Sequence, residues 1–387
     1  MENNIKNDGI VVEEENKNFI QAVGNFFVRL FKNSTFRYIL KRILSSFITL
    51  LLLVAIVTAL IRLIPDSKLY DYALMQKLKA QAGEAAANRY VIVQMFKYGR
   101  MTIDGRRISV IENIFQYIYY VLPIFKTIPY AWDNRYQTVK ASWSGFIYLG
   151  RSIEESEFVT TIVSERMGIS FMISIITVIF TYIISFPLGV AMAKKPGGII
   201  DKIGSIFIVL NYAIPALVFY LIMNSVFGDK NGAFGAFDFG YFYEAGKPQT
   251  LIIPIFCMVF LSIPGIIIWV RRFMVDELNS DYVKFARSKG LSENRIMYTH
   301  VLRNACVPLV RNIPATLLSA LIGSYFVEEI WSIPGTGREL VQALQGTPDI
   351  PAIQGLTVLY AAISMLAFLL GDIITVFFDP RIKITER

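Results

Sequence analysis

The sequence is poor in the residues that build metal, redox and disulfide sites. Its 387 residues include two cysteines and one histidine. Cys257 lies inside one apolar run, Cys306 lies at the edge of another, and no C-x-x-C spacing occurs. We therefore expect no disulfide, no zinc site and no metal cofactor. His300 has no carboxylate or second ligand near it in the sequence, which favours a structural role over proton relay.

The sequence also lacks the signals for nucleotide binding and for cleavage of a leader. No G-x-x-x-x-G-K-[ST] phosphate loop occurs, so the chain has no such means of binding ATP, and no catalytic residue is expected. The start, residues 1–18, is acidic and polar, without the apolar stretch of a signal peptide. We therefore expect the first apolar run to remain as a membrane anchor.

Apolar residues are abundant. They make up 54% of the chain, aromatic residues make up 14%, and the mean hydropathy is +0.49. A soluble globular protein of this size is less apolar, so a membrane protein is predicted. The net charge of +8 comes from basic residues that flank apolar runs, which is typical of cytoplasmic membrane flanks and argues against a nucleic-acid partner.

Six apolar stretches are long enough to cross a bilayer as helices. They are residues 43–61, 167–193, 203–228, 248–270, 312–327 and 350–371. Segments 194–202, 271–303 and 379–387 hold three, seven and three Lys and Arg, whereas segments 228–249 and 333–349 hold two and one. The excess of positive charge places both termini in the cytoplasm. The predicted fold is an all-α, multi-pass membrane protein.

The regions between and before these stretches are assigned by composition. Residues 1–36 are expected to form a cytoplasmic tail, with an amphipathic helix at 19–31 that lies on the inner membrane surface or packs on the spans. Residues 37–65 contain the first span, and 66–165 form a large extracytoplasmic insertion. Its apolar part is interrupted by Glu112, Asn113, Gln116 and Lys126, which argues against a seventh span. Residues 166–383 hold the other spans and a cytoplasmic loop at 271–305.

That loop has a regular design. Val283, Ala286 and Gly290 recur at helical spacing, and Gly290 is a residue that commonly follows the last turn of a helix. Ser292 is a candidate N-cap for a second helix. A short helix, a glycine break and a helix leading into a span predict a projection that docks on a cytoplasmic partner.

The loop sequence DYVKFARSKGL, followed by HVLRNACVP, resembles the EAA loop of ABC importer permeases in its peptide and nickel branch. Further blocks are similar to this family: RYILKRIL at 37–44 with IRLIPD at 61–66, VEEIWSIPGTGREL at 327–340, and the last span with its D-P-R tail. Lys284 and Phe285 stand where the general EAA pattern has a glutamate and an alanine. Residues 70–145 have no counterpart in the minimal pattern.

The resemblance implies an ABC type I importer permease fold and a non-enzymatic transport subunit, most like the B-type oligopeptide permease, in a bacterial plasma (inner) membrane. It implies a second homologous permease, two ATPase subunits that bind ATP and Mg²⁺, an extracytoplasmic binding protein and a peptide substrate. The residues that it assigns to ATPase coupling are Tyr282, Val283, Ala286, Arg287, Lys289, Gly290, Leu291, Arg303 and Asn304.

Candidates for the translocation path are polar residues and prolines in or beside the spans. In the third and fourth spans they are Asn211, Pro215, Asn224, Ser262 and Pro264, for which packing between helices is an equal alternative. Glu328 and Trp331, at the outer end of the fifth span, are candidates for contact with substrate or with a binding protein. Asp372 in the sixth span favours a structural hydrogen bond over substrate contact, and the role of Arg311 is open.

Three rivals remain. A dipeptide or nickel-chelate permease would carry the same loop. An ion-gradient-driven secondary transporter predicts inverted repeats and paired intramembrane charges, and the two halves of the sequence show no evident repeat. A membrane sensor or scaffold predicts a cytoplasmic signalling domain, for which no cytoplasmic segment is long enough.

Overall fold

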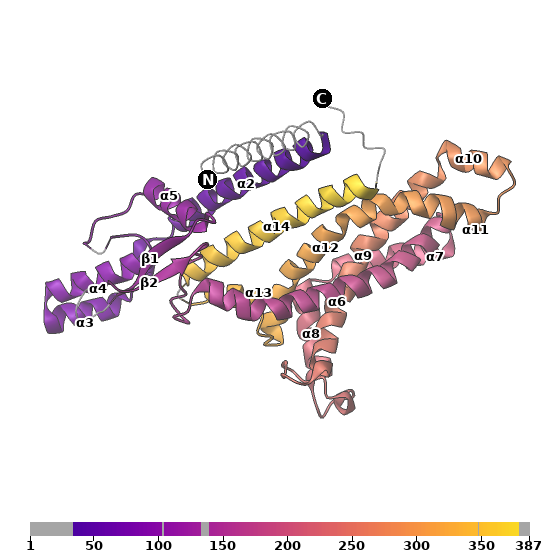
Figure 1. The fold of residues 1–387 in the computed structure, drawn as a ribbon. Coiled ribbons are helices and arrows are strands. Elements are labelled where there is room, and N and C mark those ends of the chain that lie inside the picture. The colour runs from indigo at the N-terminus through magenta and orange to yellow at the C-terminus, as the bar shows by residue number, and fades with distance from the viewer. Residues whose placement is uncertain (1–33, 103, 133–138, 347, 379–387) are drawn as a thin grey trace, which may run out of the picture.

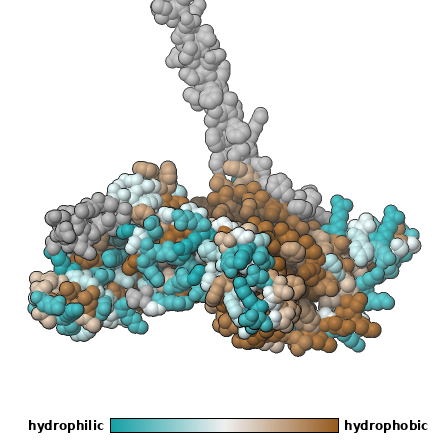
Figure 2. Space-filling view, turned by 90° about the horizontal axis from the view of Figure 1, so that it is seen from below, coloured by the Kyte–Doolittle hydropathy of each residue, from teal (hydrophilic) through white to brown (hydrophobic). Residues whose placement is uncertain are grey.

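The computed structural model describes residues 34–102, 104–132, 139–346 and 348–378, and within them the chain is mostly helical. The expected amphipathic helix at 19–31 lies outside the described residues. The long helices run roughly side by side through the centre of the molecule, with a subdomain at one end and a short helical projection at the other (Figure 1). Figure 2 shows hydrophobic surface over the middle of the molecule and hydrophilic surface at both ends, as expected for a protein that crosses a bilayer.

Five described helices are long and apolar enough to cross a membrane. They are contained in α2 (Ser34–Ile61), α6 (Val159–Lys194), α9 (Ile252–Leu278), α12 (Leu302–Ile330) with the turns before it, and α14 (Ile350–Phe378). Helices α6 and α9 pack against each other along their lengths, and α12 packs against α6, α9 and α14. α2 packs mainly on α14, which leaves much of its apolar surface exposed.

The stretch expected as the third span is divided into two helices. α7 (Ile199–Ala213) and α8 (Ala216–Gly228) meet at an angle of 92°, so the pair counts as a sixth span only if both helices belong to one crossing. Pro215 explains the break. Its ring disfavours helical geometry at the preceding residue, and Ile214 has an extended backbone with φ −84° and ψ 119°.

The insertion between α2 and α6 is a small mixed subdomain. It contains α3 (Tyr72–Ala82), α4 (Glu84–Lys97), α5 (Val110–Val121) and an antiparallel hairpin of β1 (Lys126–Trp132) and β2 (Val139–Gly145). The hairpin was not predicted from the sequence. α5 has 12 residues and is too short to cross a bilayer, which agrees with the expectation that this region holds no seventh span.

Two buried charged side chains attach this subdomain to the spans. The Arg100 guanidinium donates to the carbonyls of Ile61, Arg62 and Ile64 at 2.8, 2.9 and 3.1 Å, so it caps the end of α2. The Asp349 carboxylate, just before α14, accepts from the Ser152 hydroxyl at 2.7 Å and from nearby backbone N–H groups. The subdomain is therefore fixed to the ends of the first and last long helices.

Candidate functional site: the projection between α9 and α12

The loop between α9 and α12 forms the two-part helical projection that the sequence predicts. α10 (Asp281–Ser288) is followed by Gly290 with φ +75°, a left-handed conformation that suits glycine. Ser292 occupies the N-cap position of α11 (Glu293–Arg295), although its side chain makes no capping hydrogen bond. A π-helical turn (Ile296–Val301), which includes His300, then leads into α12.

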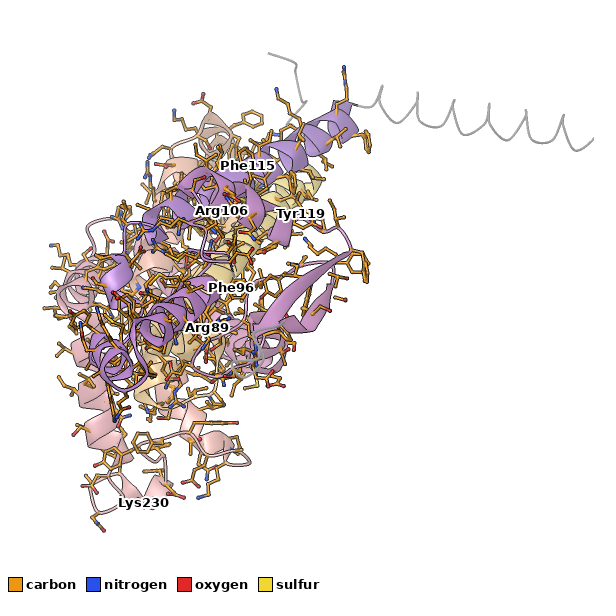
Figure 3. The ribbon with its side chains drawn as sticks, turned by 90° about the vertical axis from the view of Figure 1, so that its left-hand side faces the viewer. Arg89, Phe96, Arg106, Phe115, Tyr119 and Lys230 are labelled. Carbon is orange, nitrogen blue, oxygen red and sulfur yellow. The ribbon has the colours of Figure 1, made fainter. Side chains whose placement is uncertain are left out.

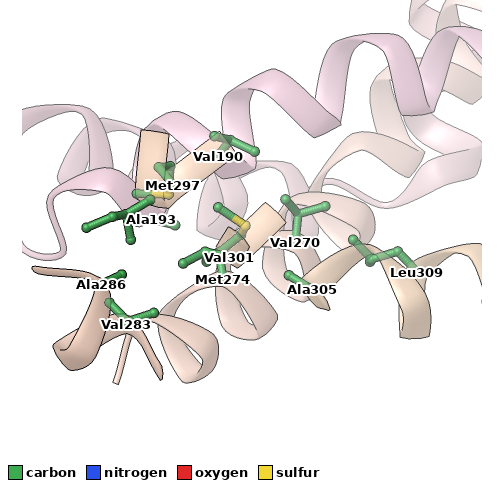
Figure 4. Close-up of a cluster of buried hydrophobic side chains, with 11 residues drawn as sticks. Val190, Ala193, Val270, Met274, Val283, Ala286, Met297, Val301, Ala305 and Leu309 are labelled. Atoms are coloured by element: carbon green, nitrogen blue, oxygen red, sulfur yellow. The ribbon is translucent and has the colours of Figure 1, made fainter. Parts of the chain in front are cut away.

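An apolar cluster fastens α10 to the long helices (Figure 4). Val283 and Ala286 are buried in it against side chains from α6, α9 and the start of α12. The other members are Val190, Ala193, Val270, Met274, Ile296, Met297, Val301, Ala305 and Leu309. Because protein interiors are close-packed, a displacement of α10 has to move these helices or break the cluster.

Polar contacts make the projection rigid. The Arg287 guanidinium donates to both carboxylate oxygens of Glu293 at 2.8 and 3.2 Å, which joins α10 to α11 across the glycine break. This hydrogen-bonded pairing raises the pKa of Arg287. Tyr282 donates its hydroxyl to Glu277 at 2.5 Å, which ties the start of α10 to the end of α9. The projection is therefore held from both sides of α10.

The opposite face of α10 is exposed. Phe285 is 61% exposed, and the Lys289 ammonium lies 4.4 Å from the centre of its ring. Lys284, Arg287 and Lys289 add positive charge to this face, and Arg303 is exposed on α12. The residues that the resemblance assigns to coupling therefore fall into two groups, one that anchors α10 and one that an incoming partner can reach. Phe285 was missed in that assignment, and its signal was a large aromatic residue on the polar face of an amphipathic helix.

Three of the candidate residues for the translocation path donate hydrogen bonds to backbone carbonyls of the same chain. The Asn211 amide is buried and donates to the Phe260 carbonyl at 3.0 Å. Asn224 donates to the Tyr241 carbonyl at 2.9 Å, and Ser262 donates to the carbonyl one turn earlier at 2.7 Å. Pro215 is exposed at the α7–α8 break, and Pro264 is buried within α9. The structure does not bring these five residues together at one surface.

Glu328 and Trp331 are both fully enclosed at the end of α12. Glu328 has no exposed surface, and its carboxylate accepts hydrogen bonds from the Ser324 hydroxyl and from the N–H groups of Gly337 and Arg338 at 2.7, 2.7 and 3.0 Å. The two N–H groups belong to the first turn of α13 (Thr336–Ala343). Glu328 therefore acts as a carboxylate cap on a helix N-terminus, while Trp331 packs in an apolar cluster that includes Tyr220.

The sequence left the role of Arg311 open, and the structure shows that it pairs with Asp372. Its guanidinium lies 3.2 Å from one carboxylate oxygen of Asp372, and the Arg42 guanidinium lies 2.5 Å from the other. Asp372 is buried, and the three side chains come from α12, α14 and α2. The cluster therefore joins α2 to α12 and α14, which agrees with a structural role for Asp372.

Replacing Asp372 by Asn should loosen the packing of α2. The change leaves two arginine charges close together at a site of low polarity, and loss of one partner of a buried pair typically costs about 3–5 kcal/mol. Since both arginines are half exposed, we expect the lower part of that range. The thermal unfolding midpoint of the protein in nanodiscs should fall, whereas Asp104→Asn, at an exposed loop position, should leave it unchanged. Equal midpoints for the two variants would contradict this role.

The described residues contain no group of three or more His, Cys, Asp or Glu side chains placed to hold a metal ion. The projection presents apolar, aromatic and cationic side chains.

Comparison with known proteins gives a consistent result. Residues 185–384 match the family model described as the inner membrane component of binding-protein-dependent transport systems, which is just over half of the chain. The oligopeptide transport system permease protein AmiC of Streptococcus pneumoniae is 33% identical over 213 residues, which cover 55% of this chain and 42% of that protein. The match thus spans less than half the length of the pneumococcal protein.

Two further relatives are covered more fully. The dipeptide transport system permease protein DppB of Lactococcus lactis is 29% identical over 62% of this chain and 80% of that protein. DppB of Bacillus subtilis is 26% identical over 91% of this chain and 99% of that protein. Among solved structures, a match to a chain of the MetNI methionine ABC transporter covers 57% of this chain and 97% of the transporter chain, at 16% identity and a TM-score of 0.47.

Proposed function

Because this chain belongs to the family of inner membrane components of binding-protein-dependent transport systems, we propose that it is the membrane permease subunit of an ATP-driven peptide importer. The relatives named as oligopeptide and dipeptide permeases support peptide as the substrate class. A dipeptide or a nickel chelate is the alternative cargo within the same class. The chain itself makes and breaks no bond.

The proposed topology has six spans with both termini in a bacterial cytoplasm, in an ABC type I importer permease fold, and α7 and α8 count together as the third span. Residues 1–36 form the cytoplasmic tail, 37–65 the first span, 66–165 the extracytoplasmic subdomain, and 166–383 the permease domain with its coupling loop at 271–305. The distribution of Lys and Arg in the connections supports this orientation.

The proposal rests mainly on α10, which has one buried face and one exposed face. One face is fixed to α6, α9 and α12 by Val283 and Ala286, and the other presents Phe285 to a partner. A partner that pulls on the exposed face therefore moves the long helices. We assign this docking to two cytoplasmic ATPases that bind ATP and Mg²⁺, with a homologous second permease completing the path and an extracytoplasmic binding protein delivering peptide.

The experiment is affinity purification of the tagged chain in mild detergent, wild type beside Gly290→Arg, with mass spectrometry and an ATPase assay. Wild type should bring down a second permease and ATP-hydrolysing subunits, and Gly290→Arg should lose the ATPases because the new side chain projects from the docking loop. Gly246→Arg is the matched control, since Gly246 also has a positive φ, +87°, with open space around it, but lies in the loop between α8 and α9.

A wild-type chain that purifies alone and transports in liposomes without ATP would overturn the proposal in favour of a gradient-driven carrier. Such a carrier would need charged groups within its spans to bind the coupling ion. The cluster of Asp372 with Arg42 and Arg311 is the candidate for that role. The dependence of uptake on ATP distinguishes the ATP-driven importer from the gradient-driven carrier.

A further inference from the structure

We propose that α5 and the turn that follows it are inserted into the membrane leaflet next to the end of α2, where they contact lipid acyl chains. In this arrangement, one part of the insertion between α2 and α6 lies within the membrane and the rest lies in water. The inference rests on the crossing of the membrane by α2 and is independent of the substrate and of the energy source of the proposed importer.

α5 runs antiparallel to α2 and alongside its last turns. At the start of α5, the Arg62 guanidinium just beyond α2 donates to the Ile108 carbonyl. Further along, Tyr117 packs in a cluster with Val54 of α2 and Val358 of α14. Val54 lies about 10 Å from the end of α2 at the helical rise per residue. The chain therefore enters α5 at the level of the end of α2 and continues beside its membrane-crossing part.

The polarity of α5 changes along the same direction. Near its start, Arg106 pairs with Glu112 at 2.7 Å, and both side chains are exposed. Exposed apolar or aromatic side chains lie along α5, in the turn after it and in the segment after β2, and they are Ile111, Phe115, Tyr119, Ile124, Phe125, Phe146 and Ile147. Phe115 is 68% exposed, more than Ile56 on the exposed face of α2, which is 59% exposed. Figure 3 shows Phe115 and Tyr119 on α5, apart from Arg89 on α4.

The last carbonyls of α5 accept hydrogen bonds from other groups of the protein. The last carbonyls of a helix lack partners within the helix, and at membrane depth each needs one from the protein. The Lys126 ammonium, which is 3% exposed, donates to the carbonyls of Tyr119, Tyr120 and Leu122 at 2.5, 2.8 and 2.6 Å. The Tyr148 N–H also donates to the Tyr120 carbonyl at 2.9 Å, and the Leu122 N–H donates to the Ile118 carbonyl at 3.0 Å.

These observations select lipid as the occupant of the exposed face. The apolar side chains of α5 continue the bare face of α2 at the same depth, and a 12-residue helix reaches about 18 Å, roughly half of the hydrocarbon core. At an aqueous surface, water would satisfy the carbonyls that Lys126 takes up, and seven exposed apolar side chains near one another would favour aggregation.

The test is the depth of nitroxide labels attached at Phe115→Cys and Phe125→Cys, in the full chain with its co-purifying subunits in lipid nanodiscs. Cys257→Ala and Cys306→Ala provide the background. Accessibility to oxygen, which concentrates in lipid, is compared with accessibility to a water-soluble nickel complex. Ile56→Cys on α2 is the lipid reference, and Arg89→Cys on the exposed face of α4 is the water reference.

The expected result is a ratio of oxygen to nickel accessibility at positions 115 and 125 that matches position 56 and exceeds position 89 several-fold. Nickel accessibility equal to that at position 89 would place the face in water and overturn the proposal. Low accessibility to both reagents would show that protein covers the face and would overturn it equally. The measurement needs neither ATP nor transport, so its failure is distinct from failure of the importer proposal.

Discussion

If the proposed ATPase subunits dock on α10, a Phe285→Asp variant is expected to lose them while it keeps its own fold. Phe285 is the large exposed aromatic residue of α10, and its side chain makes no part of the apolar cluster that holds the helix. Exposed aromatic residues at the centre of a docking surface are the usual anchors of an interface and typically contribute about 2–4 kcal/mol each. That amount corresponds to a loss of affinity of about 30-fold or more. Transport should fall to background.

The measurement is co-purification and titration of the ATPase subunits, together with the thermal unfolding midpoint of the chain. Phe242→Asp is the matched control, because Phe242 is an equally exposed phenylalanine in the loop between α8 and α9. Phe242→Asp should retain the ATPases, and both variants should unfold at the wild-type temperature. If Phe285→Asp binds the ATPases as wild type does, Phe285 is not the anchor of the docking surface.

The coupling loop was the part of the molecule best predicted from sequence, because its determinants are local. The spacing of Val283 and Ala286 and the position of Gly290 predict a short helix that ends at a glycine break. The structure has α10 and then Gly290 with a positive φ, and it adds that Val283 and Ala286 are buried. Which long helices receive that face could not be derived, because the receiving residues lie on three elements far apart in the chain. Their contacts depend on tertiary packing and leave no periodic signal.

The outer insertion shows where composition alone was insufficient. Glu112, Gln116 and Lys126 interrupt the apolar run and argue against a seventh span, and the 12 residues of α5 are too few for one. In the structure, Lys126 caps the end of α5. A lysine five residues beyond the end of an aromatic-rich helix could have been recognised as a capping partner. The strand β2 alternates between apolar and polar residues, but β1 does not and contains Pro129, so the sequence lacked the pair of alternating runs that indicates a hairpin.

The third span shows a limit of a different kind. The position of its break has a local physical reason, since Pro215 restricts the backbone of the residue before it. The angle of 92° is set by the packing of α7 and α8 against α9, which is a non-local property. A proline therefore predicts the position of a break but not its size.

Glu328 is expected to act on stability and not on substrate affinity, although its position at the end of a span made it a candidate for substrate contact. A carboxylate at the boundary of an apolar run is ordinarily exposed, and the signal for its burial was the glycine pair in the following P-G-T-G. A side chain at Gly335 would overlap the Glu328 carboxylate, and a Cβ at Gly337 would lie 2.8 Å from one of its oxygens. The loop therefore wraps around the carboxylate and needs glycine at both positions.

Two substitutions separate the roles. Glu328→Ala removes the acceptor of three hydrogen bonds and opens a cavity, so we expect a loss of about 3–5 kcal/mol in the free energy of unfolding. Glu328→Gln keeps the shape, and its carbonyl oxygen can replace the acceptor for the N–H groups of Gly337 and Arg338, so a smaller loss of about 1–2 kcal/mol is expected. Glu329→Gln, at the neighbouring residue, weakens only a partly exposed ion pair with Arg338 at 3.5 Å and should be close to wild type.

The thermal unfolding midpoint and the concentration dependence of peptide uptake are measured for all three variants. If Glu328 has a structural role, the unfolding midpoint is highest for wild type, lower for Glu328→Gln and lowest for Glu328→Ala. The maximal uptake rate then falls in the same order, because α13 detaches from α12. In a substrate-binding role, the negative charge itself matters. Gln and Ala would then both weaken peptide affinity by a similar factor at unchanged midpoints, and that result would return Glu328 to the translocation path.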